Sequence, residues 1–132
     1  MKRTITLISA TALVATALVA TANQTDRRAA MKQIGGAAKA ISGGADVAAN
    51  AQKIVDLAGQ VPMLFEANEI TGDSTALPAI WENYDDFTAK AGNLQAAAQA
   101  VVDAANGGGD VASAAKAMGG TCGACHKSYK GS

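Results

Sequence analysis

The sequence predicts an all-α fold, an antiparallel four-helix bundle. Residues that favour helices, above all alanine, occur along the whole chain, whereas the β-branched and aromatic runs that are typical of strands are missing. Apolar residues recur at helical spacing between glycine-rich breaks. Two short connections and one longer connection separate four helical segments, and such lengths suit neighbouring antiparallel helices.

The first helix is expected over residues 25–42, with Thr25 or Asp26 as its N-cap and a Ser-Gly-Gly sequence as its stop. The second is expected over residues 45–65. Pro62 lies near its end, and because proline lacks a backbone N–H group it is expected to kink or end this helix.

An irregular crossing is expected over residues 66–76, since it contains the turn sequence Thr-Gly-Asp-Ser. A long third helix follows over residues 77–105, with Pro78 in its first turn. Glycines at positions 107–109 end it, and Asp110 is expected to cap the fourth helix.

The fourth helix contains a C-x-x-C-H sequence, formed by Cys122, Cys125 and His126, which are the only cysteines and the only histidine of the chain. This spacing is typical of c-type haem attachment. Each cysteine sulfur can form a thioether with a haem vinyl group, and the adjacent imidazole can bind the iron. Cys122 and His126 are four residues apart and so share a helix face. One covalent haem c with its iron is therefore predicted near the C-terminus.

Three other interpretations of this motif stay open. A thioredoxin-like redox pair also uses C-x-x-C, but beside a strand–helix unit, and no convincing strand is predicted. A zinc site needs about four ligands, and the chain offers no second ligand pair. A structural disulfide across two residues would close only a small loop and stabilise little. Neither the redox pair nor the disulfide gives the histidine a role.

Residues 1–22 are predicted to be a signal peptide. Two basic residues precede a mostly apolar run over residues 5–20, and Ala-Thr-Ala at the end is an A-x-A cleavage sequence. A transmembrane anchor is the alternative, but the run is short and rich in threonine for a bilayer span. Cleavage after Ala22 leaves one domain, residues 23–132, with no membrane span and, in a bacterium, a periplasmic location.

The charge and composition of the mature chain argue against some classes of function. Nine basic and eleven acidic residues remain after cleavage, a net charge of −2, which argues against a nucleic-acid partner. Aromatic residues make up only 4% of the sequence, so a large apolar cofactor would fill a core built of small side chains. No nucleophile–base pair or paired acids are recognisable, and the protein is not expected to be an enzyme.

Together these residues resemble class II cytochromes c, the group that includes cytochrome c′ and its low-spin relatives. The similar segments are RRAAMKQIGG at 27–36, LPAIW at 77–81 with FTAKA at 87–91, and the haem motif extended to C-x-x-C-H-x-x-Y-K at 122–130. The resemblance spans essentially the whole mature chain. It implies a four-helix bundle whose haem motif lies near the C-terminus.

The resemblance also implies two further site residues. The position of Met31 faces the open side of the haem, where a methionine binds the iron in the low-spin branch. In the cytochrome c′ branch the iron stays five-coordinate. Arg27 matches a basic residue near a haem propionate. Because Gly35 and its neighbours are small and allow close approach of the first helix, His126 and Met31 are predicted as axial ligands of an electron carrier. The alternative is a five-coordinate protein that binds nitric oxide or carbon monoxide, with Met31 as a core residue.

Partners are predicted only as a class, redox proteins of unknown identity, and the chain is either a monomer or a homodimer. The acids Glu82, Asp85 and Asp86 form either a docking face for a basic partner or an ordinary solvated helix surface. Trp81 and Tyr84 are expected mainly to pack, although they could also form an electron path.

Overall fold

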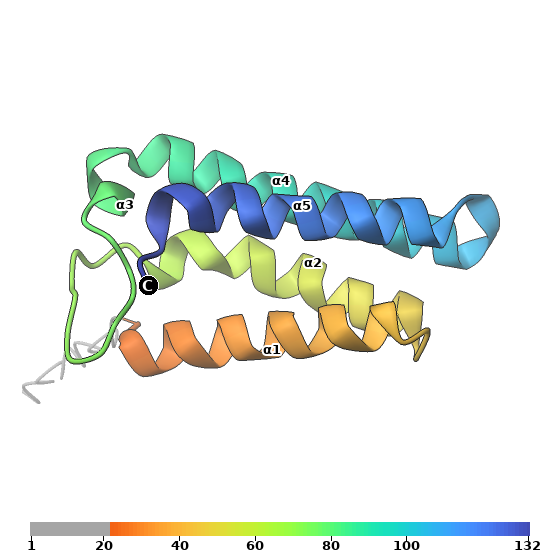
Figure 1. Cartoon of the computed structure of the whole chain (residues 1–132), viewed down its shortest axis with the longest axis horizontal. Coiled ribbons are helices and arrows are strands. Elements are labelled where there is room, and N and C mark those ends of the chain that lie inside the picture. Colours follow the sequence, from red (N-terminus) through yellow and green to blue (C-terminus); the bar gives the residue numbers. More distant parts are fainter. Residues whose placement is uncertain (1–21) are drawn as a thin grey trace, which may run out of the picture.

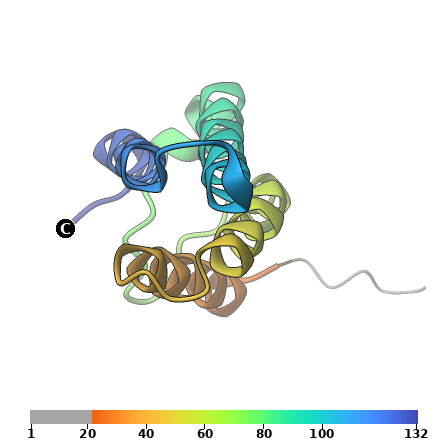
Figure 2. The same ribbon diagram turned by 90° about the vertical axis from the view of Figure 1, so that its right-hand side faces the viewer.

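The computed structural model describes residues 22–132, so the predicted signal peptide lies outside the described residues except for its last position. Four long helices, α1, α2, α4 and α5, run side by side (Figure 1), and an end-on view places them around a common centre (Figure 2). The only β-type pairing among the described residues is an isolated antiparallel bridge between Ala76 and Lys130. The predicted all-α four-helix bundle is therefore confirmed.

Helix α1 spans Gln24–Ser42 and begins one residue earlier than predicted. The predicted caps, Thr25 and Asp26, are wrong, because the side chain of Asn23 accepts the backbone N–H groups of both residues at 2.8 and 3.2 Å. The carboxylate of Asp26 in turn accepts the backbone N–H of Asn23 at 3.0 Å. This reciprocal pair is a capping box, in which the acid three residues after the cap completes the bonding of the helix start.

Helix α2 spans Val47–Leu64 and follows Asp46, whose φ of 42° places it in the left-handed region. Pro62 lies in the last turn, and the helix ends two residues after it. The side chains of Ala51, Ile54, Ala58 and Val61 form its buried face.

The long third helix predicted for residues 77–105 is interrupted. A short helix, α3 (Ala79–Glu82), is separated from α4 (Tyr84–Asp103) at Asn83, which has non-helical backbone angles. The cause is tertiary, because Trp81 Nε1 donates to the Phe65 carbonyl at 2.7 Å and so ties α3 to the end of α2. At its other end α4 continues into a π-helical turn, η1 (Ala104–Gly108).

Helix α5 spans Val111–Tyr129, and Asp110 caps it through a bond from the Ser113 N–H at 3.1 Å, as predicted. Helix α5 packs mainly against α4, and α2 packs against α4 and α1. Helices α1 and α5 share far fewer contacts. The bundle is therefore open between the first and the last helix. Among the described helices, none combines the length and apolar character that crossing a membrane requires.

Candidate haem-binding site

A cavity of about 440 Å³ opens between α1 and α5 near one end of the bundle. Its walls are mostly apolar, and the volume lies within the range of small-molecule and cofactor sites. The wall residues include Ile34, Val61, Phe65, Phe87, Ala91 and Leu94. The five residues predicted for the site, Arg27, Met31, Cys122, Cys125 and His126, also line this one cavity.

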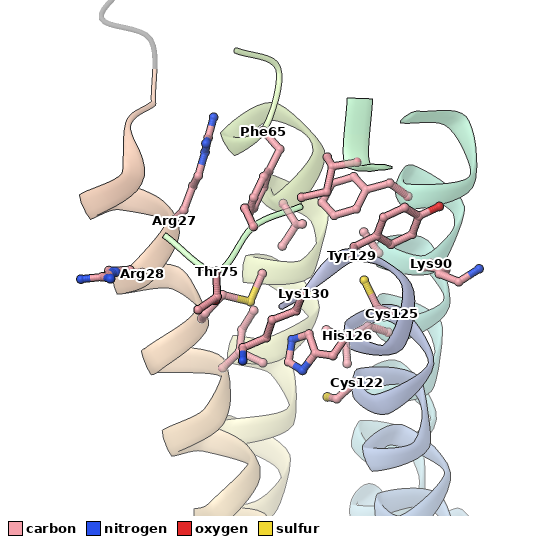
Figure 3. Close-up of a pocket in the computed structure, with 18 of the residues that line it drawn as sticks. Arg27, Arg28, Phe65, Thr75, Lys90, Cys122, Cys125, His126, Tyr129 and Lys130 are labelled. Carbon is pink, nitrogen blue, oxygen red and sulfur yellow. The ribbon is translucent and has the colours of Figure 1, made fainter. Parts of the chain in front are cut away.

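The motif residues lie in the last two turns of α5. Cys122 and Cys125 are half-buried and are free thiols, not a disulfide. The imidazole of His126 projects away from α5 toward the α1 side of the cavity (Figure 3). Desolvation by the surrounding protein, and to a lesser extent the charge of Lys130, lowers the pKa of His126. The neutral imidazole, which is the form that binds metal, is thereby favoured.

Met31 belongs to the opposite wall. It lies on α1, is half-buried and packs against the hydrophobic core. Gly35, one turn further along α1, also lines the cavity, and a Cβ atom built on it would meet nothing within 4 Å. A flat group bound between α1 and α5 would thus contact the small residue Gly35 on its α1 side and the thiols and imidazole of the motif on its α5 side.

Arg27 is 4% exposed and is held by the segment that follows α2. Its guanidinium donates to three backbone carbonyls, those of Leu64, Ala67 and Glu69, at 2.8, 2.6 and 2.6 Å. It also lies 4.7 Å from the ring centroid of Phe65. A guanidinium has five N–H donors, so two remain for another acceptor.

Trp81 and Tyr84 pack as expected. Besides the Trp81 bond to Phe65, the Tyr84 hydroxyl donates to the Pro62 carbonyl at 2.5 Å, and both bonds fasten α3 and α4 to the end of α2.

Among the acids Glu82, Asp85 and Asp86, Asp86 is distinguished by its bonds. Its carboxylate accepts hydrogen bonds from Lys90 and from Tyr129. Sequence reasoning missed this cluster. The spacing of four residues between Asp86 and Lys90 could have indicated the first pair, but no local signal indicates the second.

The zinc alternative for the motif needs several metal-ligating side chains in one place. Within residues 22–132, no three or more His, Cys, Asp and Glu side chains are grouped so that they could hold a metal ion. The redox-pair alternative needs a neighbouring strand, and the motif lies instead within a helix that packs on another helix.

Comparison with known proteins agrees with this geometry. Residues 22–130 match the family described as "Cytochrome C'". The chain belongs to the cytochrome c′ family. It is 43% identical over 114 residues to cytochrome c-556 of Agrobacterium fabrum, covering 79% of this chain and 77% of that protein. It is 46% identical to cytochrome c-556 of an Agrobacterium tumefaciens strain, covering 79% of this chain and 93% of that protein.

Solved structures of cytochrome c′ have the same architecture. The protein from Rhodopseudomonas palustris has a TM-score of 0.68 at 29% identity, covering 82% of this chain and 94% of that chain. The protein from Shewanella frigidimarina has a TM-score of 0.67 at 27% identity, covering 80% and 91% of the two chains. Both similarities extend over most of the bundle.

Family membership confirms two predictions from the sequence, the class of protein and its cofactor. The chain is a cytochrome c′-like haem protein with covalent haem c and iron. Members of this family are electron carriers or gas binders, generally not enzymes, and are typically periplasmic.

Proposed function

We propose that this protein is an exported electron carrier whose haem c is attached through Cys122 and Cys125, with His126 and Met31 as axial ligands. One observation carries the proposal: His126 on α5 and Met31 on α1 line the same cavity from opposite walls. The iron supplies one-electron exchange, and a pair of histidine and methionine ligands is the arrangement of electron-transfer cytochromes. The electron would pass to and from redox partner proteins.

The chain's own residues have distinct tasks in this proposal. The neutral imidazole of His126 would offer a ring nitrogen to the iron, and thioethers at Cys122 and Cys125 would hold the macrocycle beside it. The apolar walls around Ile34 and Val61 would exclude water from the iron. Met31 would offer its thioether sulfur to the iron and so keep small ligands out.

The two remaining donors of Arg27 would bond to a haem propionate. Replacing Arg27 by leucine removes a positive charge near the iron, so the reduction potential should fall, and the three carbonyls lose their donor, so the free energy of unfolding should fall by about 3 kcal/mol. Arg28→Leu is the matched control for stability, since the Arg28 side chain is exposed and, within residues 22–132, bonds to Asp73 alone, to its carboxylate at 2.7 Å and its backbone carbonyl at 3.0 Å. Its loss should cost below about 1 kcal/mol. A potential that Arg27→Leu leaves unchanged would contradict the propionate contact.

A mass measurement tests both the attachment and the export signal. After periplasmic expression, the intact mass should equal that of residues 23–132 plus one haem, and acid–acetone extraction should leave the colour with the protein. Changing both Cys122 and Cys125 to alanine should abolish covalent haem, because no other thiol is available in the sequence. Haem that stays covalently bound in this double variant would show that the attachment is assigned to the wrong residues.

The second candidate function is gas binding at a five-coordinate iron, with Met31 as a packing residue beside an open ligand pocket. It is favoured by the solved neighbours, which are cytochromes c′. Carbon monoxide separates the two functions. An iron that Met31 already ligates should react slowly in the reduced protein, whereas an open site should react rapidly.

A further inference from the structure

His126 lies where a helix is least constrained. Helix α5 ends at Tyr129, so His126 belongs to the last turn. The His126 carbonyl accepts the N–H of the capping residue Lys130 at 3.0 Å, whereas the carbonyls that follow it have no partner inside the helix. Helix ends fray unless other parts of the protein hold them. Helix α5 also has few contacts with α1 on the cavity side. The chain that follows the turn is held by a bridge between Lys130 and Ala76 and by the Gly131 N–H, which donates to the Thr75 carbonyl at 2.7 Å. The orientation of the imidazole therefore depends on these bonds and on what fastens the turn itself to α4.

Tyr129 fastens the turn in three ways. Its carbonyl accepts the Leu77 N–H at 3.1 Å. Its ring is 5% exposed and packs edge-to-face on Phe87, with 5.4 Å between centroids. Its hydroxyl points toward α4 (Figure 3) and donates to the carboxylate of Asp86.

Asp86 is itself held in place. Both of its carboxylate oxygens accept from Lys90 Nζ, at 3.0 and 2.9 Å, one helical turn further along α4. Lys90 Nζ also lies 6.0 Å from the centroid of the Tyr129 ring. The hydrogen bond to Asp86 raises the pKa of Tyr129 to about 12, so the hydroxyl remains a donor at physiological pH. The three side chains thus form a closed cluster beside the half-buried Cys125.

We propose that Tyr129 is a positioning residue for His126: its hydroxyl bond to Asp86, braced by Lys90, fixes the rotation of the last turn of α5 and with it the angle at which the imidazole meets the iron. Tyr129 and His126 are three residues apart, on adjoining faces of the same turn, so a rotation of one moves the other. The inference rests on the proposed role of His126 as the proximal ligand.

The test uses Tyr129→Phe and Asp86→Asn in the haem-loaded protein. Tyr129→Phe keeps the buried ring and the backbone bond, so the variant should fold. Both changes are made in a Met31→Ala background, where the ferrous iron is five-coordinate and the iron–histidine stretch is visible by resonance Raman. We expect each variant to shift or broaden this band in the same direction, and the double variant to add nothing further.

Asp85→Asn is the matched control, because it removes the same charge from the adjacent position, and within the described residues Asp85 has no bond to Tyr129. The iron–histidine band of this control variant should not shift. A band that neither Tyr129→Phe nor Asp86→Asn moves, while the free energy of unfolding falls, would reduce Tyr129 to a structural role and overturn the inference. An equal shift in Asp85→Asn would overturn it too, since the effect would then be one of charge. His126→Ala in the same background tests the ligand assignment separately. A band that survives there contradicts the proposed function and with it the inference. A band that is lost in His126→Ala but unmoved by Tyr129→Phe and Asp86→Asn overturns the inference alone.

Discussion

In the His126→Ala variant, essentially every molecule should lose the absorption spectrum of low-spin haem, while the haem stays covalently attached. The proposed thioethers at Cys122 and Cys125 do not depend on the imidazole, but the iron would lose its strong nitrogen ligand. The reduction potential should change by about 0.1 V or more, since axial ligands tune haem over about 0.8 V. Absorption spectra and potentiometry measure both effects, and haem staining of a denaturing gel verifies the attachment.

Added imidazole provides a second arm of this experiment. The variant leaves space where the side chain stood, so free imidazole should enter the cavity and restore much of the low-spin spectrum. Lys127→Ala is the control, because Lys127 is the next residue of α5 and is exposed away from the cavity lining. An unchanged spectrum and potential in His126→Ala would mean that the iron is ligated by another residue.

The helices could be predicted from the sequence where their cause is local. Helical spacing of apolar residues, the glycines after α1 and α4, and Asp110 before α5 all act within a few positions. The break at Asn83 was missed because its cause is distant. Trp81 bonds to Phe65, 16 residues away, and Tyr84 bonds to Pro62, 22 residues away.

The candidate site shows the same difference between local and distant causes. Cys122, Cys125 and His126 form a local motif whose spacing predicts haem attachment, and the family resemblance added Met31 and Arg27; all five line the cavity. The surroundings of these residues depend on the fold. The carbonyls that hold Arg27 are 37 to 42 residues away from it, and Asp86 is 43 residues away from Tyr129. Such contacts carry no periodic signal, because they are set by the packing of α2 and α4 against their neighbours.

Replacing Met31 by alanine should turn the proposed electron carrier into a ligand-binding haem protein. If its sulfur binds the iron, the oxidised wild-type protein should show the weak near-infrared charge-transfer band of thioether–ferric haem, and Met31→Ala should abolish it. The potential should fall, because a thioether favours the ferrous state. Carbon monoxide should react rapidly with the reduced variant and slowly with the reduced wild-type protein.

Met31→Ala should also lower the free energy of unfolding, but by less than the loss of a fully buried methionine would. Met31 is only half-buried, so truncation should cost on the order of 2 kcal/mol through lost packing, near the low end of the range for buried methionines. The lost iron–sulfur bond adds to this cost in the holoprotein. Urea unfolding monitored by circular dichroism gives the total.

Met63→Ala is the matched control for these measurements, since it deletes the same side chain from an exposed position on α2. Met63 is 59% exposed and does not line the cavity. Its removal should leave the spectrum and the carbon monoxide rate unchanged and alter the stability by no more than about 0.5 kcal/mol. A wild-type protein that is already high-spin, binds carbon monoxide rapidly and keeps its spectrum in Met31→Ala would contradict the electron-carrier proposal. The cavity beside Met31 would then be the gas pocket of a five-coordinate cytochrome c′, because Gly35 and the half-buried methionine leave room for a small ligand on that side.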